Sequence, residues 1–189
     1  MTYKLWLKKL KLNYSKDVFD IIQFGSSVIE GDTPNDVDIT VVFQKIPLKE
    51  QLNQAQEIKN QLQEQLNIPI HINVFDLYSF FDKGNFAKES ILFYGRSLIS
   101  NDYFSKKFDL NPKLQISYSL NKLQKKEKVM FHYLLKGKKG KYGLLRKYGG
   151  ELLNPGLIEI APEHEKIFLN AITEITKDFK IKKVFLSEP

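Results

Sequence analysis

The sequence predicts an α/β protein of the α+β kind, whose first part folds around a small mixed sheet with flanking helices. Two short runs rich in β-branched residues occupy positions 18–24 and 37–43, a helical repeat follows from position 47, and a third apolar run covers 68–75. An order of strand, turn, strand, helix, strand and helix is typical of such domains.

The first two strands enclose a turn and a loop. Residues 18–24 (VFDIIQF) lead directly into Gly25-Ser26-Ser27, where we expect a tight turn. Gly31, Pro34 and Asn35 then mark a loop before the strand at 37–43 (VDITVVF). Because side chains alternate along a strand, Asp36, Asp38 and Thr40 should share one face, and the other face should be apolar.

A helix and a third strand follow. Pro47 suits the first turn of a helix, in which apolar residues recur at steps near 3.6, namely Leu48, Leu52, Ala55, Leu62 and Leu66. In the strand at 68–75, His71, Asn73 and Phe75 should face the same way. A helix over 87–94 should end at Gly95.

The sequence after the first domain predicts a smaller, basic α/β unit. Asn111-Pro112 indicates a boundary, which gives domains at 1–110 and 111–189. We expect a helix at 120–136, a Gly- and Lys-rich stretch, a strand at 157–160, a helix at about 163–177 and a strand at 181–186.

Composition limits the chemistry. The chain has no cysteine and three histidines, so a metal must be held by carboxylates, histidines or amides, and an oxygen-rich magnesium-type site is favoured. No apolar run reaches membrane-spanning length and the start lacks a signal-peptide pattern, so we expect a cytoplasmic protein with no membrane partner. Abundant Lys and Ile fit either a thermophile or an AT-rich genome.

Two carboxylates at spacing two on one strand, Asp36 and Asp38, can bind a cation or a pair of cations. Gly25-Ser26 lies eleven residues earlier, where a glycine lets the backbone approach a phosphate. A D-x-D pair alone is more often a solvated strand edge, and a lone Gly-Ser is equally unspecific. The combination of strand, Gly-Ser, loop and DVDI strand is far more specific.

That combination resembles the DNA polymerase beta-type nucleotidyltransferases, in particular the minimal nucleotidyltransferases of prokaryotes, over about residues 15–100. The segment ILFYGRSLIS at 91–100 is also similar to the end of those proteins. The resemblance implies a sheet of the nucleotidyltransferase type, phosphate contacts from Gly25, Ser26 and Ser27, and Mg²⁺ or Mn²⁺ bound by Asp36 and Asp38. The substrate would be an NTP.

The third strand departs from this pattern, since active relatives carry a third carboxylate there. The matching positions are His71 and Asn73, and Asp76 has the opposite parity. Either Asn73 or His71 substitutes as a weaker ligand or a base, or the domain has lost catalysis. We place Asn73 with Asp36 and Asp38 as catalytic residues and interpret His71 as a polar residue on a half-exposed strand.

The basic residues are concentrated in the second half. Residues 1–95 carry 10 Lys and 12 acidic residues, whereas residues 96–189 carry 19 basic and 10 acidic ones. Between 122 and 147 the only acid is Glu127, and tyrosines are interleaved. Two interpretations of this segment are equally favoured. One is a solvated surface, and the other is RNA or DNA binding through Lys136, Lys138, Lys139, Lys141, Tyr142, Arg146 and Lys147.

Three functions fit these observations. The first is transfer of a nucleoside monophosphate from an NTP to a hydroxyl of a nucleic acid, a protein or a small molecule. The second is a nucleic-acid-binding or regulatory protein on a catalytically degenerate nucleotidyltransferase fold. The third is an antitoxin-like role beside a helical partner protein.

Overall fold

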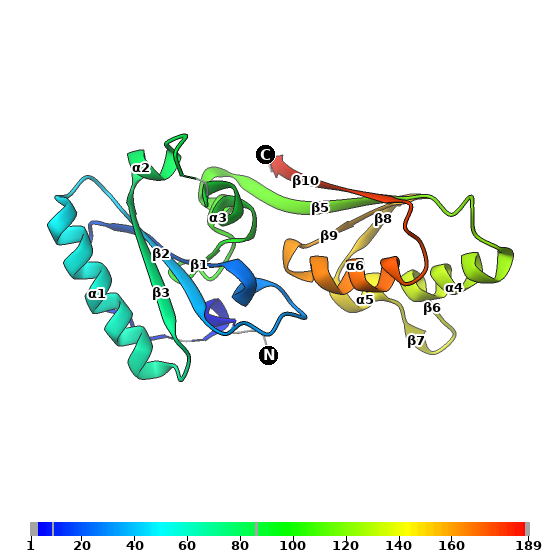
Figure 1. The fold of residues 1–189 in the computed structure, drawn as a ribbon, viewed down its shortest axis with the longest axis horizontal. Coiled ribbons are helices and arrows are strands. Elements are labelled where there is room, and N and C mark those ends of the chain that lie inside the picture. Colours follow the sequence, from blue (N-terminus) through cyan, green and yellow to red (C-terminus); the bar gives the residue numbers. More distant parts are fainter. Residues whose placement is uncertain (1–3, 9, 86, 188–189) are drawn as a thin grey trace. The chain divides into compact units, whose positions relative to one another are not determined.

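The computed structural model describes residues 4–8, 10–85 and 87–187, and the chain divides into two compact units, Met1–Asp109 (unit 1) and Leu110–Pro189 (unit 2) (Figure 1). The strands of unit 1 are β1 (Val18–Phe24), β2 (Val37–Phe43), β3 (Ile70–Asp76) and β4 (Arg96–Ser97). Its α-helices are α1 (Leu48–Gln65), α2 (Leu77–Phe81) and α3 (Lys88–Tyr94), and its 3₁₀ helices are η1 (Leu5–Leu7), η2 (Gly25–Val28) and η3 (Phe104–Phe108).

The sheet of unit 1 is mixed, in the order β3-β2-β1-β4. β1 runs antiparallel to β2 and β4, whereas β2 and β3 are parallel and α1 connects them. The α+β class and the mixed sheet predicted from the sequence are therefore confirmed. The predicted bounds of β1 and β2 are also those of the structure, because alternation within a short β-branched run is a local property.

Apolar side chains pack on both faces of this sheet. Ile39, Val41 and Phe43 of β2 belong to a cluster with Ala55, Ile58 and Leu62 of α1. Val42, on the opposite parity, packs in a second cluster with Phe80, Ile91 and Phe104. Asp38 has the parity of Val42, so it lies on the face opposite α1. Leu48 and Leu52 of α1, expected on its apolar face, are instead exposed.

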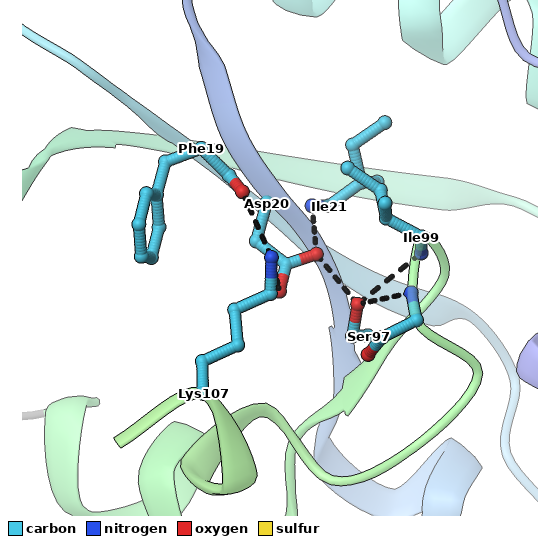
Figure 2. Close-up of polar contacts among 7 residues, drawn as sticks. Phe19, Asp20, Ile21, Ser97, Ile99 and Lys107 are labelled. Atoms are coloured by element: carbon cyan, nitrogen blue, oxygen red, sulfur yellow. Dashed lines mark hydrogen bonds and ion pairs between the residues drawn. The ribbon is translucent and has the colours of Figure 1, made fainter.

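A buried polar network joins β1 to β4 and η3 (Figure 2). Asp20 is completely buried, and its Oδ1 accepts hydrogen bonds from Ser97 Oγ at 2.7 Å and from the Ile21 amide at 2.8 Å. Lys107 Nζ lies 3.3 Å from Asp20 Oδ2 and donates to the Phe19 carbonyl. Burial raises the pKa of Asp20, and Ser97 and Lys107 oppose that rise.

Unit 2 contains a four-stranded sheet in the order β10-β5-β9-β8 and a two-stranded hairpin, β6-β7. Its strands are β5 (Leu110–Tyr118), β6 (Gly137–Lys138), β7 (Lys141–Tyr142), β8 (Glu151–Asn154), β9 (Leu157–Ile160) and β10 (Phe179–Ser187). Its helices are α4 (Lys125–Lys136), α5 (Leu144–Tyr148), η4 (Pro162–His164) and α6 (Glu165–Thr173).

Two helix bounds predicted for unit 2 were wrong in detail. The helix expected at 120–136 begins at Lys125, because Gln124 and Glu127 form a capping box there. The helix expected at 163–177 ends at Thr173. The predicted division between residues 110 and 111 lies one residue from the division between the two units at Asp109 and Leu110, although Asn111-Pro112 is part of β5 and not of a linker. β9 pairs with β5 only over residues 114–117, so Pro112 pairs with β10 alone, a setting that tolerates a proline.

Among the helices of the described residues, none combines the length and apolar character that a membrane crossing requires. Cytoplasmic localisation and the absence of a membrane partner stay predictions.

Candidate metal centre

Three potential metal ligands meet where β1 ends and β2 and β3 begin. Asp36 directly precedes β2, Asp38 is the second residue of β2, and parallel pairing places His71 of β3 beside Asp38. His71 Nδ1 lies 3.3 Å from Asp36 Oδ2 and 3.8 Å from Asp38 Oδ1. Ligand atoms of the three residues lie within 4.8 Å of one another, so the group could hold a metal ion.

Gly25 brings the turn after β1 against this group. Phe24 pairs with Asp38, and the next residue, Gly25, has a φ of +74° and opens η2. A β-carbon on Gly25 would lie 2.5 Å from Asp38 Oδ2, which is closer than real contacts allow. Glycine adopts this positive φ without strain, and any larger residue would require the Asp38 carboxylate to move.

The two serines of the turn point in different directions. Ser26 is exposed at the edge of the sheet where Asp36 and Asp38 lie, whereas Ser27 is buried. The Ser27 hydroxyl donates to the Phe24 carbonyl at 3.0 Å and accepts from Gln23 Nε2 at 3.0 Å. Ser27 therefore holds the turn in place, and a contact between Ser27 and a phosphate would have to come from its backbone amide.

The carboxylates are partly shielded from water, with side chains 35% exposed in Asp36 and 31% exposed in Asp38. Burial, and then the charge of Asp36, raises the pKa of Asp38, while His71 opposes the rise. Two like charges held this close gain from a cation placed between them.

The three β3 residues considered for the third ligand position that the resemblance implies differ in position. His71, interpreted from the sequence as merely a polar strand residue, is the one that joins Asp36 and Asp38. Asn73 pairs with Thr40, is exposed, and lies one step further along the strand face. Asp76 is five residues from His71, about 16 Å along a strand, where its carboxylate caps α2 by accepting from the Ser79 amide. Parity in the sequence placed His71 and Asn73 on one strand face, but the β2–β3 register that selects His71 is known only from the structure.

Six of the seven predicted nucleic-acid residues come together in unit 2. They line one open hollow formed by the end of α4, the β6-β7 hairpin and α5, and they are Lys136, Lys138, Lys139, Lys141, Tyr142 and Arg146. The seventh, Lys147, is not among the lining residues, and its Nζ lies 5.0 Å from the centroid of the Tyr148 ring. The predicted Lys-rich loop is thus a hairpin with a defined turn.

No protein-family model matches the chain, and no curated protein matches it either. The resemblance to nucleotidyltransferases stays a prediction from the sequence motif.

Proposed function

We propose that unit 1 is a metal-dependent nucleotidyltransferase that transfers a nucleoside monophosphate from an NTP to a hydroxyl acceptor. The observation that carries the proposal is the convergence of Asp36, Asp38 and His71 on the turn at Gly25-Ser26. A carboxylate-rich cation site beside exposed backbone at a glycine turn suits a triphosphate, which binds through both divalent cations and amides.

Each residue has a separate part in the proposed reaction. Asp36, Asp38 and His71 would hold the cation, and the Gly25-Ser26 backbone with the Ser26 hydroxyl would bind the phosphates. The acceptor hydroxyl loses its proton to water as its oxygen forms a bond to the α-phosphorus, the bond from that phosphorus to the bridging oxygen of the β-phosphate breaks, and pyrophosphate leaves. A bound divalent cation supplies charge neutralisation of the triphosphate and activation of the hydroxyl.

The histidine influences which cation we propose. Imidazole binds transition-metal ions better than Mg²⁺, whose ligands are almost always oxygens. We therefore place Mn²⁺ ahead of Mg²⁺, although the sequence favoured magnesium. His71 also stands where the resemblance implies a carboxylate, so the site has one anionic ligand fewer. This favours a second candidate, a catalytically degenerate nucleotidyltransferase-fold protein that binds nucleotide or a protein partner without turnover.

The direct test is incubation of the full chain with each α-³²P-labelled NTP, Mn²⁺ or Mg²⁺, and RNA, DNA and protein acceptors. We expect label transfer with one or more acceptors, faster in Mn²⁺, and loss of transfer in Asp36→Asn with Asp38→Asn. The matched control is Glu57→Gln with Glu64→Gln, which removes two exposed charges from α1.

Calorimetry of NTP binding separates the two candidates. Metal-dependent binding without label transfer would favour the degenerate protein. If neither transfer nor metal-dependent NTP binding occurs in the parent chain, or if the double aspartate variant binds as the parent does, the proposed site is wrong.

A further inference from the structure

Unit 2 contains two hollows that share one residue, Lys136. The first, of about 540 Å³, lies between α4, the end of β5 and the β8–β9 turn, and we name it the aromatic cavity. Tyr118, which is half-buried, lines it and packs against the buried ring of Phe131, with ring centroids 4.7 Å apart. Half-buried Leu152 adds apolar surface. Its volume lies within the range of small-molecule sites, and its largely apolar lining suits a planar ring.

The second hollow, which we name the lysine hollow, has a volume of about 720 Å³. Its lining includes the cations Lys136, Lys138, Lys139, Lys141 and Arg146, and none of the described residues that line either hollow is acidic. Five cations with no acid among the described lining residues repel one another, so a polyanion lowers their electrostatic energy.

The hairpin that presents these cations is held firmly at its base. Gly137 has a φ of +90°, and a β-carbon on Gly143 would lie 2.3 Å from the Leu135 carbonyl oxygen. This close crossing fixes β6-β7 between α4 and α5. Gly140, with nothing within 4 Å of its β-carbon position, leaves the turn open for backbone approach by a ligand.

One aromatic ring at the lysine hollow is exposed and oriented. Tyr142 is 69% exposed, and the Arg146 guanidinium carbon lies 4.1 Å from its ring centroid. Arginine stacking on one face restrains the ring and leaves its other face available to a flat ligand. Lys138 is similarly placed over Tyr133, with its Nζ 5.4 Å from that centroid.

We propose that unit 2 binds single-stranded nucleic acid, with phosphates in the lysine hollow, one base in the aromatic cavity and another stacked on Tyr142. A single strand carries anionic groups beside planar rings, and unit 2 offers cations beside aromatic surface, with Lys136 lining both hollows. A duplex keeps its bases inside the helix, so they cannot enter the cavity. An acidic peptide provides charge without a planar ring beside each carboxylate.

This binding surface does not depend on the metal centre. The Asp36→Asn with Asp38→Asn variant should therefore bind oligonucleotides as the parent chain does, even if nucleotidyl transfer is lost or never observed. Loss of oligonucleotide binding in that variant would overturn the assignment to unit 2.

The charge contribution is tested by fluorescence anisotropy of the full chain with a labelled twelve-nucleotide oligo(dT) or oligo(U) over a range of salt concentrations. The triple variant Lys138→Gln, Lys139→Gln and Lys141→Gln should bind more weakly, with a log-log salt slope smaller by about 2. A control that removes the same charge from exposed positions outside the hollow is Lys177→Gln, Lys180→Gln and Lys182→Gln. Equal effects of the two triple variants would contradict the proposal.

The base contacts are tested by changing the ligand instead of the protein, which avoids any effect on folding. A strand of abasic spacers with the same number of phosphates should bind at least about tenfold more weakly than oligo(dT), because base contacts are worth about 5- to 150-fold each. A blunt duplex should also bind more weakly. If the abasic strand, the duplex or a free mononucleotide binds as tightly as the oligonucleotide, the proposed single-strand site is wrong.

Tyr142→Ala should weaken oligo(dT) binding by about 5- to 150-fold and leave the salt slope unchanged, since stacking releases no counterions. Tyr78→Ala, which removes a tyrosine that is 79% exposed in unit 1, is the matched control and should bind as the parent does. An unchanged affinity in Tyr142→Ala would exclude stacking on this ring.

Discussion

Gly25 lies so close to Asp38 that a β-carbon added to it would come within 2.5 Å of the carboxylate oxygen Oδ2. The turn after β1 and the second residue of β2 are thus parts of one site, and the glycine determines how near backbone and carboxylate can approach. Trp6 is the only tryptophan and is buried in this unit, so its fluorescence reports unfolding of unit 1 in the full chain.

Gly25→Ala should weaken metal binding at least about tenfold and lower the free energy of unfolding by about 1–2 kcal/mol, because the new methyl group displaces Asp38 and an L residue is strained at this positive φ. Calorimetry with Mn²⁺ and denaturant unfolding measure the two effects. Gly84→Ala is the control, since no atom lies within 4 Å of its β-carbon position. Equal Mn²⁺ affinity in both variants would show that the turn and Asp38 are not coupled.

His71→Asp and Asn73→Asp distinguish the two strand positions proposed for the missing carboxylate. The sequence predicts that Asn73→Asp raises activity, whereas the geometry favours His71, whose ring nitrogen lies 3.3 Å from Asp36. We expect His71→Asp to shift the preference from Mn²⁺ towards Mg²⁺ by about tenfold, since it replaces a nitrogen ligand by an anionic oxygen. Competition between the two ions measures the shift. A larger shift in Asn73→Asp would assign the third position to residue 73.

Ser26→Ala and Ser27→Ala should differ in which property they change, stability or NTP binding. Ser27 is buried and hydrogen-bonded to Gln23 and Phe24, so its loss should destabilise unit 1 by about 1–2 kcal/mol. Ser26 is exposed, so its loss should leave stability within about 0.5 kcal/mol of the parent and weaken NTP binding if its hydroxyl contacts a phosphate. Unfolding curves and NTP calorimetry on the same samples provide both values. A large loss of stability in Ser26→Ala would contradict the observed orientation of the turn.

Lys107→Met should destabilise unit 1 by about 2 kcal/mol at neutral pH, because it leaves the carboxylate of Asp20 buried without its cation. The folded-state pKa of Asp20 lies above its ordinary value of 3.8, so protonation favours the folded state and the ionised form costs stability at neutral pH. The difference in free energy of unfolding between variant and parent should therefore shrink as the pH falls through the raised pKa of Asp20 towards 3.8.

The neighbouring substitution Lys106→Met controls for this effect. Lys106 pairs with Asp102 at 3.0 Å, but both side chains are more than 40% exposed, so the loss should be under about 1 kcal/mol. A pH-independent loss in Lys107→Met equal to that in Lys106→Met would mean that Lys107 does not compensate the buried charge.

The sequence by itself determined the local features of unit 1. The bounds of β1 and β2 follow from short β-branched runs, and alternation alone places Asp38 on the face opposite Ile39, which packs towards α1. The turn at Gly25 and the shared face of Asp36 and Asp38 could be predicted from the same local patterns. These features depend on neighbours within a few residues, where the chain geometry leaves little freedom.

Only the tertiary structure decided which distant residues meet. His71 joins Asp36 and Asp38 because packing of α1 fixes the parallel register of β2 and β3, and a shift of one residue would turn His71 to the other face. Ser27 points inward because its hydroxyl accepts a hydrogen bond from Gln23 Nε2 and donates one to the Phe24 carbonyl. Lys107 reaches Asp20 because η3 packs on β1. Such contacts depend on register and packing across the whole unit, which local patterns in the sequence do not specify.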